Sequence, residues 1–293
     1  MSAPGQHPRQ AALLVLATAL SVQAGSAVAT RLFTLVDPAG ATALRALGAA
    51  AIMVVAAGGP ASLRRVPREA MGTIAGLGLS AAAMNLCFYE AISRIPLGAA
   101  VTVEFLGPIA LAAATTHRRS DVGWAVTALA GVALVSGGLE GHAGAVGIGF
   151  ALAAGALWAT YLTFARRLGH GGTGLAGLAA ALVVAAAASA PILLVSHPST
   201  GDLPEALLLG LAVGTLSNAL GFALEIQALR RASLTVVGVL LSIEPAVAAL
   251  IGFVALDQGL APVQIAGIAL VIAAGAGVVR GSGGGAAPVD PGG

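Results

Sequence analysis

Residues 91–112 read AISRIPLGAAVTVEFLGPIALA, and residues 228–249 read ALRRASLTVVGVLLSIEPAVAA. The two stretches match when the chain is shifted by 137 positions, and flanking positions match at a shift of 136. The matched pairs are Ala91 and Ala228, Arg94 and Arg231, Pro108 and Pro245, then Asp121 and Asp257, and Gly131 and Gly267. A repeat of this length spans half of the chain. We therefore predict two related halves, residues 1–140 and 141–280, followed by a disordered tail at 281–293.

The composition points to lipid as the solvent of this chain. Of its 293 residues, 58% are hydrophobic and 9% are charged, and the mean hydropathy is +0.95. One water-soluble core cannot bury so much apolar surface. The 41 glycines fit the same interpretation, because small residues let helices pack closely in a bilayer. The basic residues are all arginines between apolar runs, so they indicate membrane topology and not a nucleic-acid partner.

Ten apolar stretches are long enough to cross about 30 Å of hydrocarbon as helices, which takes roughly 20 residues each. They are residues 11–30, 40–57, 71–93, 97–116, 121–138, 145–165, 173–196, 205–228, 233–255 and 261–279. The first run ends in Ser-Ala-Val-Ala, which resembles a signal-peptide cleavage site. Because further apolar stretches follow, we expect this run to remain as the first span.

The arginines predict the orientation. With a cytoplasmic N-terminus, eleven of the fourteen lie on the cytoplasmic side, as the positive-inside rule requires. They are Arg9, Arg64, Arg65, Arg68, Arg118, Arg119, Arg166, Arg167, Arg230, Arg231 and Arg280. Five spans in each half place the second half upside down relative to the first. The sequence thus predicts an all-α membrane protein of ten transmembrane helices in two inverted five-helix repeats, with both termini cytoplasmic.

Intramembrane carboxylates are the first candidates for function, since a charged side chain costs about 2.5–3.5 kcal/mol at the bilayer centre. Glu104 and Glu244 lie close to Pro108 and Pro245, which interrupt helical hydrogen bonding and can free carbonyl groups toward a cavity. A site between two inverted repeats with broken helices is typical of secondary transporters.

Other carboxylates have a structural alternative. Glu225 is a candidate for substrate binding, but it can equally pair with Arg230 or Arg231. For Glu90, we favour an i,i+4 ion pair with Arg94 near the outer surface.

Neutral polar residues inside the spans extend the candidate site. Each of them can instead serve as interhelical hydrogen-bonding glue. They are Gln23, Asn85, Tyr89, Trp158, Tyr161 and Asn218. Arg45 lies about five residues from the outer end of its span, so we expect it to extend outward to the membrane surface.

Three stretches carry a resemblance to the drug/metabolite transporters of the EamA type, and within them to the bacterial threonine/homoserine exporters. These stretches are SVQAGSAVATRLFTLVDPAGATALRALG at 21–48, MNLCFYEAISRIPLGAAVTVEFLGPIALA at 84–112 and SIEPAVAALIGF at 242–253, and GALWATYL at 155–162 adds support. The resemblance implies ten helices in the bacterial inner membrane. Carried over by position, it points to Gln23, Arg45, Asn85, Tyr89, Glu104, Pro108, Trp158, Tyr161, Glu225, Glu244 and Pro245. Glu90 and Asp257-Gln258 depart from the pattern.

The expected activity is export of a small amino acid, whose ammonium would pair with a buried carboxylate and whose carboxylate would face helix N-termini. Export of other metabolites or drugs on the same fold is the alternative. An intramembrane enzyme, a channel and an assembly protein are disfavoured, since the sequence holds no catalytic or filter motif. We expect no cofactor and no metal. The sequence leaves open the amino acid and the oligomeric state.

Proton antiport is the expected energy source because no nucleotide-binding motif is present. Burial favours the neutral form of a carboxyl group, and a bound ammonium favours the ionised form. One carboxyl group could therefore exchange a proton for cargo. Glu104 or Glu244 is the expected carrier, followed by Glu225.

Overall fold

The computed structural model describes residues 8–116, 119–137, 141–170, 172–221, 224 and 242–283, and the described part of the chain contains helices and turns without a strand. Six of its helices are long and apolar enough to cross a membrane, and four shorter apolar helices accompany them. The predicted all-α membrane class is confirmed at this level. Residues 225–241, with Glu225 and the first part of the predicted ninth span, lie outside the described residues, as do residues 284–293 of the predicted tail.

The elements of the first half are α1 (Pro8–Leu32), α2 (Pro38–Ala56), η1 (Pro60–Arg65), η2 (Arg68–Ala70), α3 (Met71–Ile92), α4 (Leu97–Glu104), α5 (Leu106–Thr116) and α6 (Arg119–Gly137). Those of the second half are α7 (Gly141–His170), α8 (Gly174–Ser189), η3 (Ala190–Leu194), α9 (Leu203–Val213), η4 (Gly214–Leu220), α12 (Glu244–Leu256) and α13 (Pro262–Gly283). Six of the described α-helices begin at or next to a proline, where the missing N–H breaks no helical bond; they are α1, α2, α4, α9, α12 and α13.

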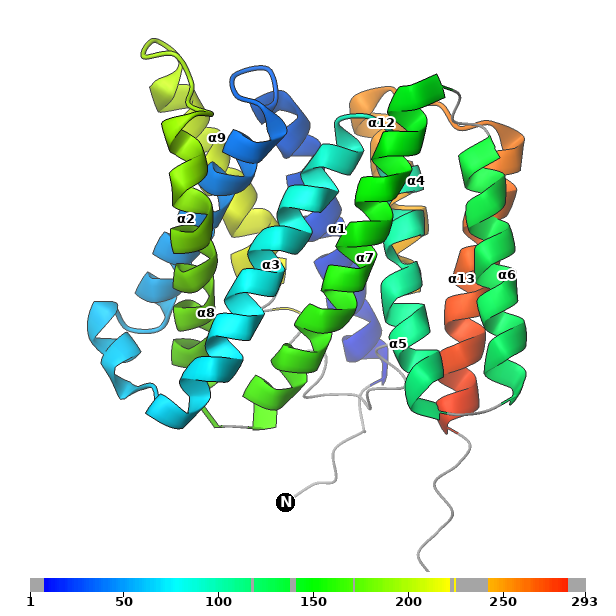
Figure 1. Cartoon of the computed structure of the whole chain (residues 1–293), viewed down its shortest axis with the longest axis horizontal. Coiled ribbons are helices and arrows are strands. Elements are labelled where there is room, and N and C mark those ends of the chain that lie inside the picture. The colour runs from blue at the N-terminus through cyan, green and yellow to red at the C-terminus, as the bar shows by residue number, and fades with distance from the viewer. Residues whose placement is uncertain are drawn as a thin grey trace, which may run out of the picture.

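The helices stand side by side as one bundle (Figure 1). At one end lie the α1–α2 turn and the start of α9, and the start of α1 lies at the opposite end. Asp37 fixes the α1–α2 turn, because its Oδ1 accepts the Gly40 N–H at 2.7 Å and its Oδ2 accepts the Ser196 hydroxyl at 2.7 Å. The turn is therefore tied to the segment that precedes α9.

The predicted fourth span consists of two helices, and the break between them lies close to Pro108, as expected for a proline inside a helix. The helix is interrupted at Phe105, between α4 and α5, three residues before Pro108. Proline has no N–H to donate to the carbonyl of Glu104, four residues earlier. That carbonyl does not face a cavity as we expected; it lies against α7, where a methyl group on Gly155 would come within 2.5 Å of it.

The tightest helix crossing at the edge of the bundle joins α6 and α13, which lie side by side in Figure 1. It is built on Gly131 and Gly267, the pair that the sequence repeat superposes. A methyl group on Gly131 would lie 2.6 Å from the Gly267 carbonyl oxygen, and one on Gly267 would lie 2.5 Å from that of Gly131. Only glycine lets two helix backbones approach this closely.

We expect Gly131→Ala to destabilise the protein by about 1–3 kcal/mol, because the new methyl group overlaps the backbone of α13. Gly123→Ala on the same helix is the matched control: a methyl group there has no atom within 4 Å and should leave stability unchanged or raise it. Thermal unfolding of the purified variants in detergent measures both. Equal melting temperatures for the two variants would contradict this account of the crossing.

Candidate functional site

The site begins with a close approach between α2 and α9. Gly210 and Gly214 lie four residues apart on one face, as in the small-xxx-small packing of membrane helices. A methyl group on Gly48 of α2 would lie 2.7 Å from the Gly210 carbonyl oxygen, and one on Gly214 would lie 2.6 Å from that of Arg45. The backbones are therefore in contact at the level of Arg45. The chain continues from α9 directly into the π-helical η4, and Asn218 lies in η4, four residues after Gly214.

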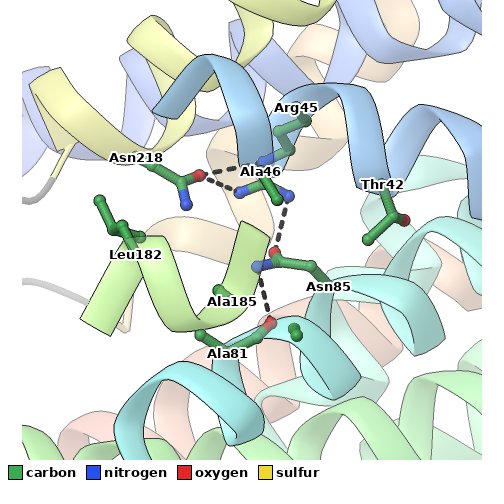
Figure 2. A pocket seen from close by; sticks show the side chains of 9 residues that line it. Thr42, Arg45, Ala46, Ala81, Asn85, Leu182, Ala185 and Asn218 are labelled. Atoms are coloured by element: carbon green, nitrogen blue, oxygen red, sulfur yellow. Dashed lines mark hydrogen bonds between the residues drawn. The ribbon is translucent and has the colours of Figure 1, made fainter. Parts of the chain in front are cut away.

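Arg45 is the centre of a buried hydrogen-bond network (Figure 2). Its Nε and Nη2 donate to Asn218 Oδ1 at 2.9 and 2.5 Å, and its Nη1 donates to Asn85 Oδ1 at 2.6 Å. The Asn85 amide in turn donates to the Ala81 carbonyl at 2.8 Å. Arg45 is 7% exposed, so our expectation that it extends outward is wrong. Two amide oxygens inside the bundle bind the guanidinium instead.

Arg45 forms no ion pair in the described part of the chain, and Glu104 acts on its charge only from beyond ion-pair distance. The ion pairs found there join Arg31 to Glu205 and Arg94 to Glu90. Both acceptors of Arg45 are neutral amides, and its third neighbour is the Tyr89 ring, whose centroid lies 5.2 Å from Cζ. Amides and an aromatic face solvate a guanidinium without neutralising it.

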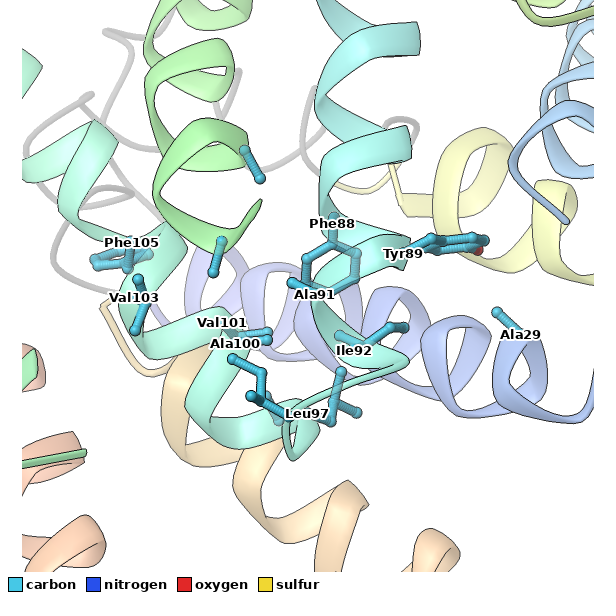
Figure 3. Close-up of a cluster of buried hydrophobic side chains, with 14 of the residues drawn as sticks. Ala29, Phe88, Tyr89, Ala91, Ile92, Leu97, Ala100, Val101, Val103 and Phe105 are labelled. Atoms are coloured by element: carbon cyan, nitrogen blue, oxygen red, sulfur yellow. The ribbon is translucent and has the colours of Figure 1, made fainter. Parts of the chain in front are cut away.

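Two buried polar atoms of the candidate residues lack well-formed hydrogen bonds. Tyr89 is completely buried and its ring packs edge-on against Phe33 at 5.4 Å; its hydroxyl has no partner in hydrogen-bond geometry, although the Arg45 guanidinium lies close enough to act on it. Figure 3 shows the Tyr89 side chain on the side of α3 away from Phe105 and Val103. The Gln23 Oε1 atom on α1, 2% exposed, is also without a partner. Such groups are uncommon because each costs about 1–3 kcal/mol.

The two carboxylates that the repeat relates lie on packed helices. Glu104 ends α4 and Glu244 begins α12, these two helices contact each other, and both side chains are buried. Glu104 interacts electrostatically with both Glu244 and Arg45. The contact between α4 and α12 thus brings the two repeat-related carboxylates into one part of the bundle, within electrostatic reach of Arg45, and their role in substrate binding stays a prediction.

The remaining candidates lie at the edges of this centre. Trp158 packs edge-on against Phe105 at 5.6 Å, beside the break that follows Glu104. Tyr161 lies one turn further along α7, in the hydrophobic cluster of α3, α7 and α8. Pro108 lies in α5 beyond the break, and Pro245 in the first turn of α12. Glu225 lies outside the described residues.

Two residues that depart from the family pattern have structural positions. Glu90 forms the expected i,i+4 ion pair with Arg94. Asp257 ends α12 in the left-handed conformation (φ 54°), where glycine is usual, and the next residue, Gln258, accepts the Leu97 N–H at the start of α4 at 2.9 Å. The turn after α12 therefore caps a helix of the first half.

Two spaces adjoin these residues. A cavity of about 10 Å³, room for about one water molecule, is lined by Arg45, Asn85, Asn218 and small side chains of α2, α3 and α8 (Figure 2). A wider, open cavity of about 560 Å³ lies at the end of the bundle that holds the α1–α2 turn, and Phe33, Arg94 and Gln258 are among its walls. Phe33, a wall of the wide cavity, packs against Tyr89, whose ring in turn contacts the Arg45 guanidinium.

Comparison with known proteins gives the family. Residues 145–280 match the EamA-like transporter family. The chain is 38% identical over 267 residues to the threonine/homoserine exporter RhtA of Salmonella typhimurium, covering 89% of each chain, and 36% identical over 266 residues to RhtA of Escherichia coli K12, covering 89% of this chain and 88% of that one. The chain belongs to the EamA-like transporter family.

The transporter also shares its fold with a protein of known crystal structure, with a TM-score of 0.65 over 94% of this chain and 99% of the other at 21% identity. It is a multi-pass membrane protein and not an enzyme, as the sequence predicts. Sequence reasoning did not give Arg45 its central role. A lone arginine inside a span was the available signal, since such a charge needs partners within the bundle.

Proposed function

We propose that this transporter exports small amino acids of the threonine and homoserine type across the bacterial inner membrane. The observation that carries the proposal is the identity of 36–38% over 89% of the chain to exporters named for these two amino acids. The buried cluster of Arg45, Glu104 and Glu244 supports it, because a zwitterion presents one charge to each kind of group.

We also propose the finer architecture of ten spans in two inverted repeats, residues 1–140 and 141–280. Six long and four shorter apolar helices add up to ten. The packing of helices supports the symmetry, since it is conserved when the halves are exchanged. Thus α1 contacts α9 as α7 contacts α3, α3 contacts α8 as α9 contacts α2, and α1 contacts α12 as α7 contacts α4, while the pairs α2–α8, α4–α12 and α6–α13 map onto themselves.

The arginines orient this architecture with both termini in the cytoplasm. A fusion of alkaline phosphatase after Arg280 should be inactive, because the enzyme matures only outside the cytoplasm, whereas a fusion in the loop after Pro198 should be active. The reverse pattern, or activity at both sites, would contradict an inverted repeat of five and five spans.

Within the site, Glu104 and Glu244 are proposed to receive the substrate ammonium. Glu104→Gln and Glu244→Gln should each reduce export about ten- to a hundredfold, the loss expected for a hydrogen bond to a charged group worth about 1.5–3 kcal/mol. Uptake of radiolabelled threonine into inverted vesicles measures this. Glu205→Gln, an exposed carboxylate paired with Arg31, is the matched control and should transport normally. Normal transport by both site variants at normal membrane levels would make the two carboxylates structural.

Proton antiport is the proposed energy source, with Glu104 or Glu244 as the carrier. A buried carboxyl group can release its proton when an ammonium binds and regain one on the more acidic side. In inverted vesicles with the membrane potential clamped at zero, an acidified lumen should drive threonine accumulation, and the Gln variant of the carrier should lose that response. Accumulation that ignores the pH gradient would reject proton coupling and leave another driving ion or facilitated diffusion.

A further inference from the structure

Arg45 carries a buried charge that the proposed ammonium site does not use. Three of its N–H groups donate to two amide oxygens, and a guanidinium has five. No carboxylate in the described part of the chain forms an ion pair with it. An uncompensated charge within a bundle of apolar helices is expensive to retain. Such an arrangement of guanidinium N–H groups is suited to binding an anion.

The surroundings of Arg45 also fit an anion of a particular size. Four of the nine residues that line the cavity beside it are alanines, which have no polar groups to compete for the guanidinium. Asn85 and Asn218 accept from Arg45 through oxygen, but each amide also has two N–H donors, so rotation would turn donors toward an anion. The unpartnered Tyr89 hydroxyl, whose ring lies under the guanidinium, is a further donor.

We propose that Arg45 is the anchor for the α-carboxylate of the transported substrate, with Asn85 and Asn218 holding its place in the empty, closed state. This inference rests on the proposed function and replaces our expectation that helix N-termini receive the carboxylate. A planar guanidinium binds a carboxylate through two parallel hydrogen bonds. Because Glu104 interacts electrostatically with Arg45, a zwitterion between them meets opposite charges at its two ends.

The closed cavity has room for only about one water molecule, so the anchor requires that the bundle open before substrate binds. The wide cavity beyond Phe33 provides the nearest open space. Arg45 and Asn85 both lie in the first half and Asn218 lies in the second, so opening between the halves would release the Asn218 contact and free two guanidinium N–H groups for the carboxylate.

The test compares each ligand with its carboxamide, which has the same shape without the negative charge. Purified protein in lipid nanodiscs is titrated calorimetrically with L-threonine and L-threoninamide, and with 3-hydroxybutyrate and its amide, which lack the ammonium. The wild type should bind threonine at least about tenfold more tightly than threoninamide. Arg45→Gln should reduce that ratio to about one, and Arg45→Lys should retain part of it.

Asn218→Asp is the second variant, for the case that Arg45→Gln does not fold. It places a carboxylate of nearly the same shape against the guanidinium, so the protein retains its packing while the anchor is occupied from within. The acid-to-amide ratio should again approach one. Arg31→Gln, which removes an exposed arginine at the end of α1, is the matched control and should keep the wild-type ratio.

A wild-type acid-to-amide ratio in Arg45→Gln or in Asn218→Asp would overturn the anchor, as would a wild type that binds threoninamide as well as threonine. In the latter case amino-acid transport would stand. A wild type that ignores threonine but binds 3-hydroxybutyrate more tightly than its amide would reject the proposed function and keep the anchor. Binding of none of the four ligands would overturn both.

Discussion

Removing the Arg45 charge from water is the constraint on which the centre of this bundle depends. A guanidinium at the bilayer centre costs about 2.5–3.5 kcal/mol even on insertion scales, so its N–H groups need acceptors within the protein. The acceptors come from α3 and η4, which lie 40 and 173 positions away in the chain. Asn218 lies within reach of Arg45 because Gly48, Gly210 and Gly214 let the backbones of α2 and of α9 with η4 touch. The hydrogen bonds between Arg45 and Asn218 and the glycine contacts between these helices therefore depend on each other.

Much of the fold follows from local sequence. Apolar runs of the right length mark the spans, and prolines mark where helices begin, as at Pro38, Pro204 and Pro262. Pro108 marks a break because its missing N–H acts on a residue four positions earlier, a purely local effect. The repeat also relates the segments that carry Glu104 and Glu244, and the structure shows that the corresponding helices α4 and α12 pack together.

The environment of Arg45 was not predictable in the same way. Its distance from the end of the span indicates that the side chain can reach the surface. Only the tertiary packing of α3 and η4 supplies the buried amide acceptors that hold it inside the bundle. Asn218 has no special signal either: its place depends on the π-helical turn of η4, which no residue type announces. Asn85 and Tyr89 were predicted to share a face of α3, and they do, but their common neighbour comes from another helix. Local periodicity fixes which residues face inward and leaves their partners undetermined.

The choice of amides around Arg45 has a physical consequence. A carboxylate in place of Asn85 or Asn218 would neutralise the guanidinium permanently, and the attraction between buried charges at contact distance is far stronger than in water. An amide oxygen accepts hydrogen bonds that hold the side chain in place, but it carries no full negative charge and does not neutralise the guanidinium. The residual attraction is then available to an incoming anion, and because Asn218 belongs to the half opposite Arg45, the strength of that attraction depends on how the halves are placed. Affinity for cargo and closure of the bundle thereby act on the same two N–H groups, those that donate to Asn218.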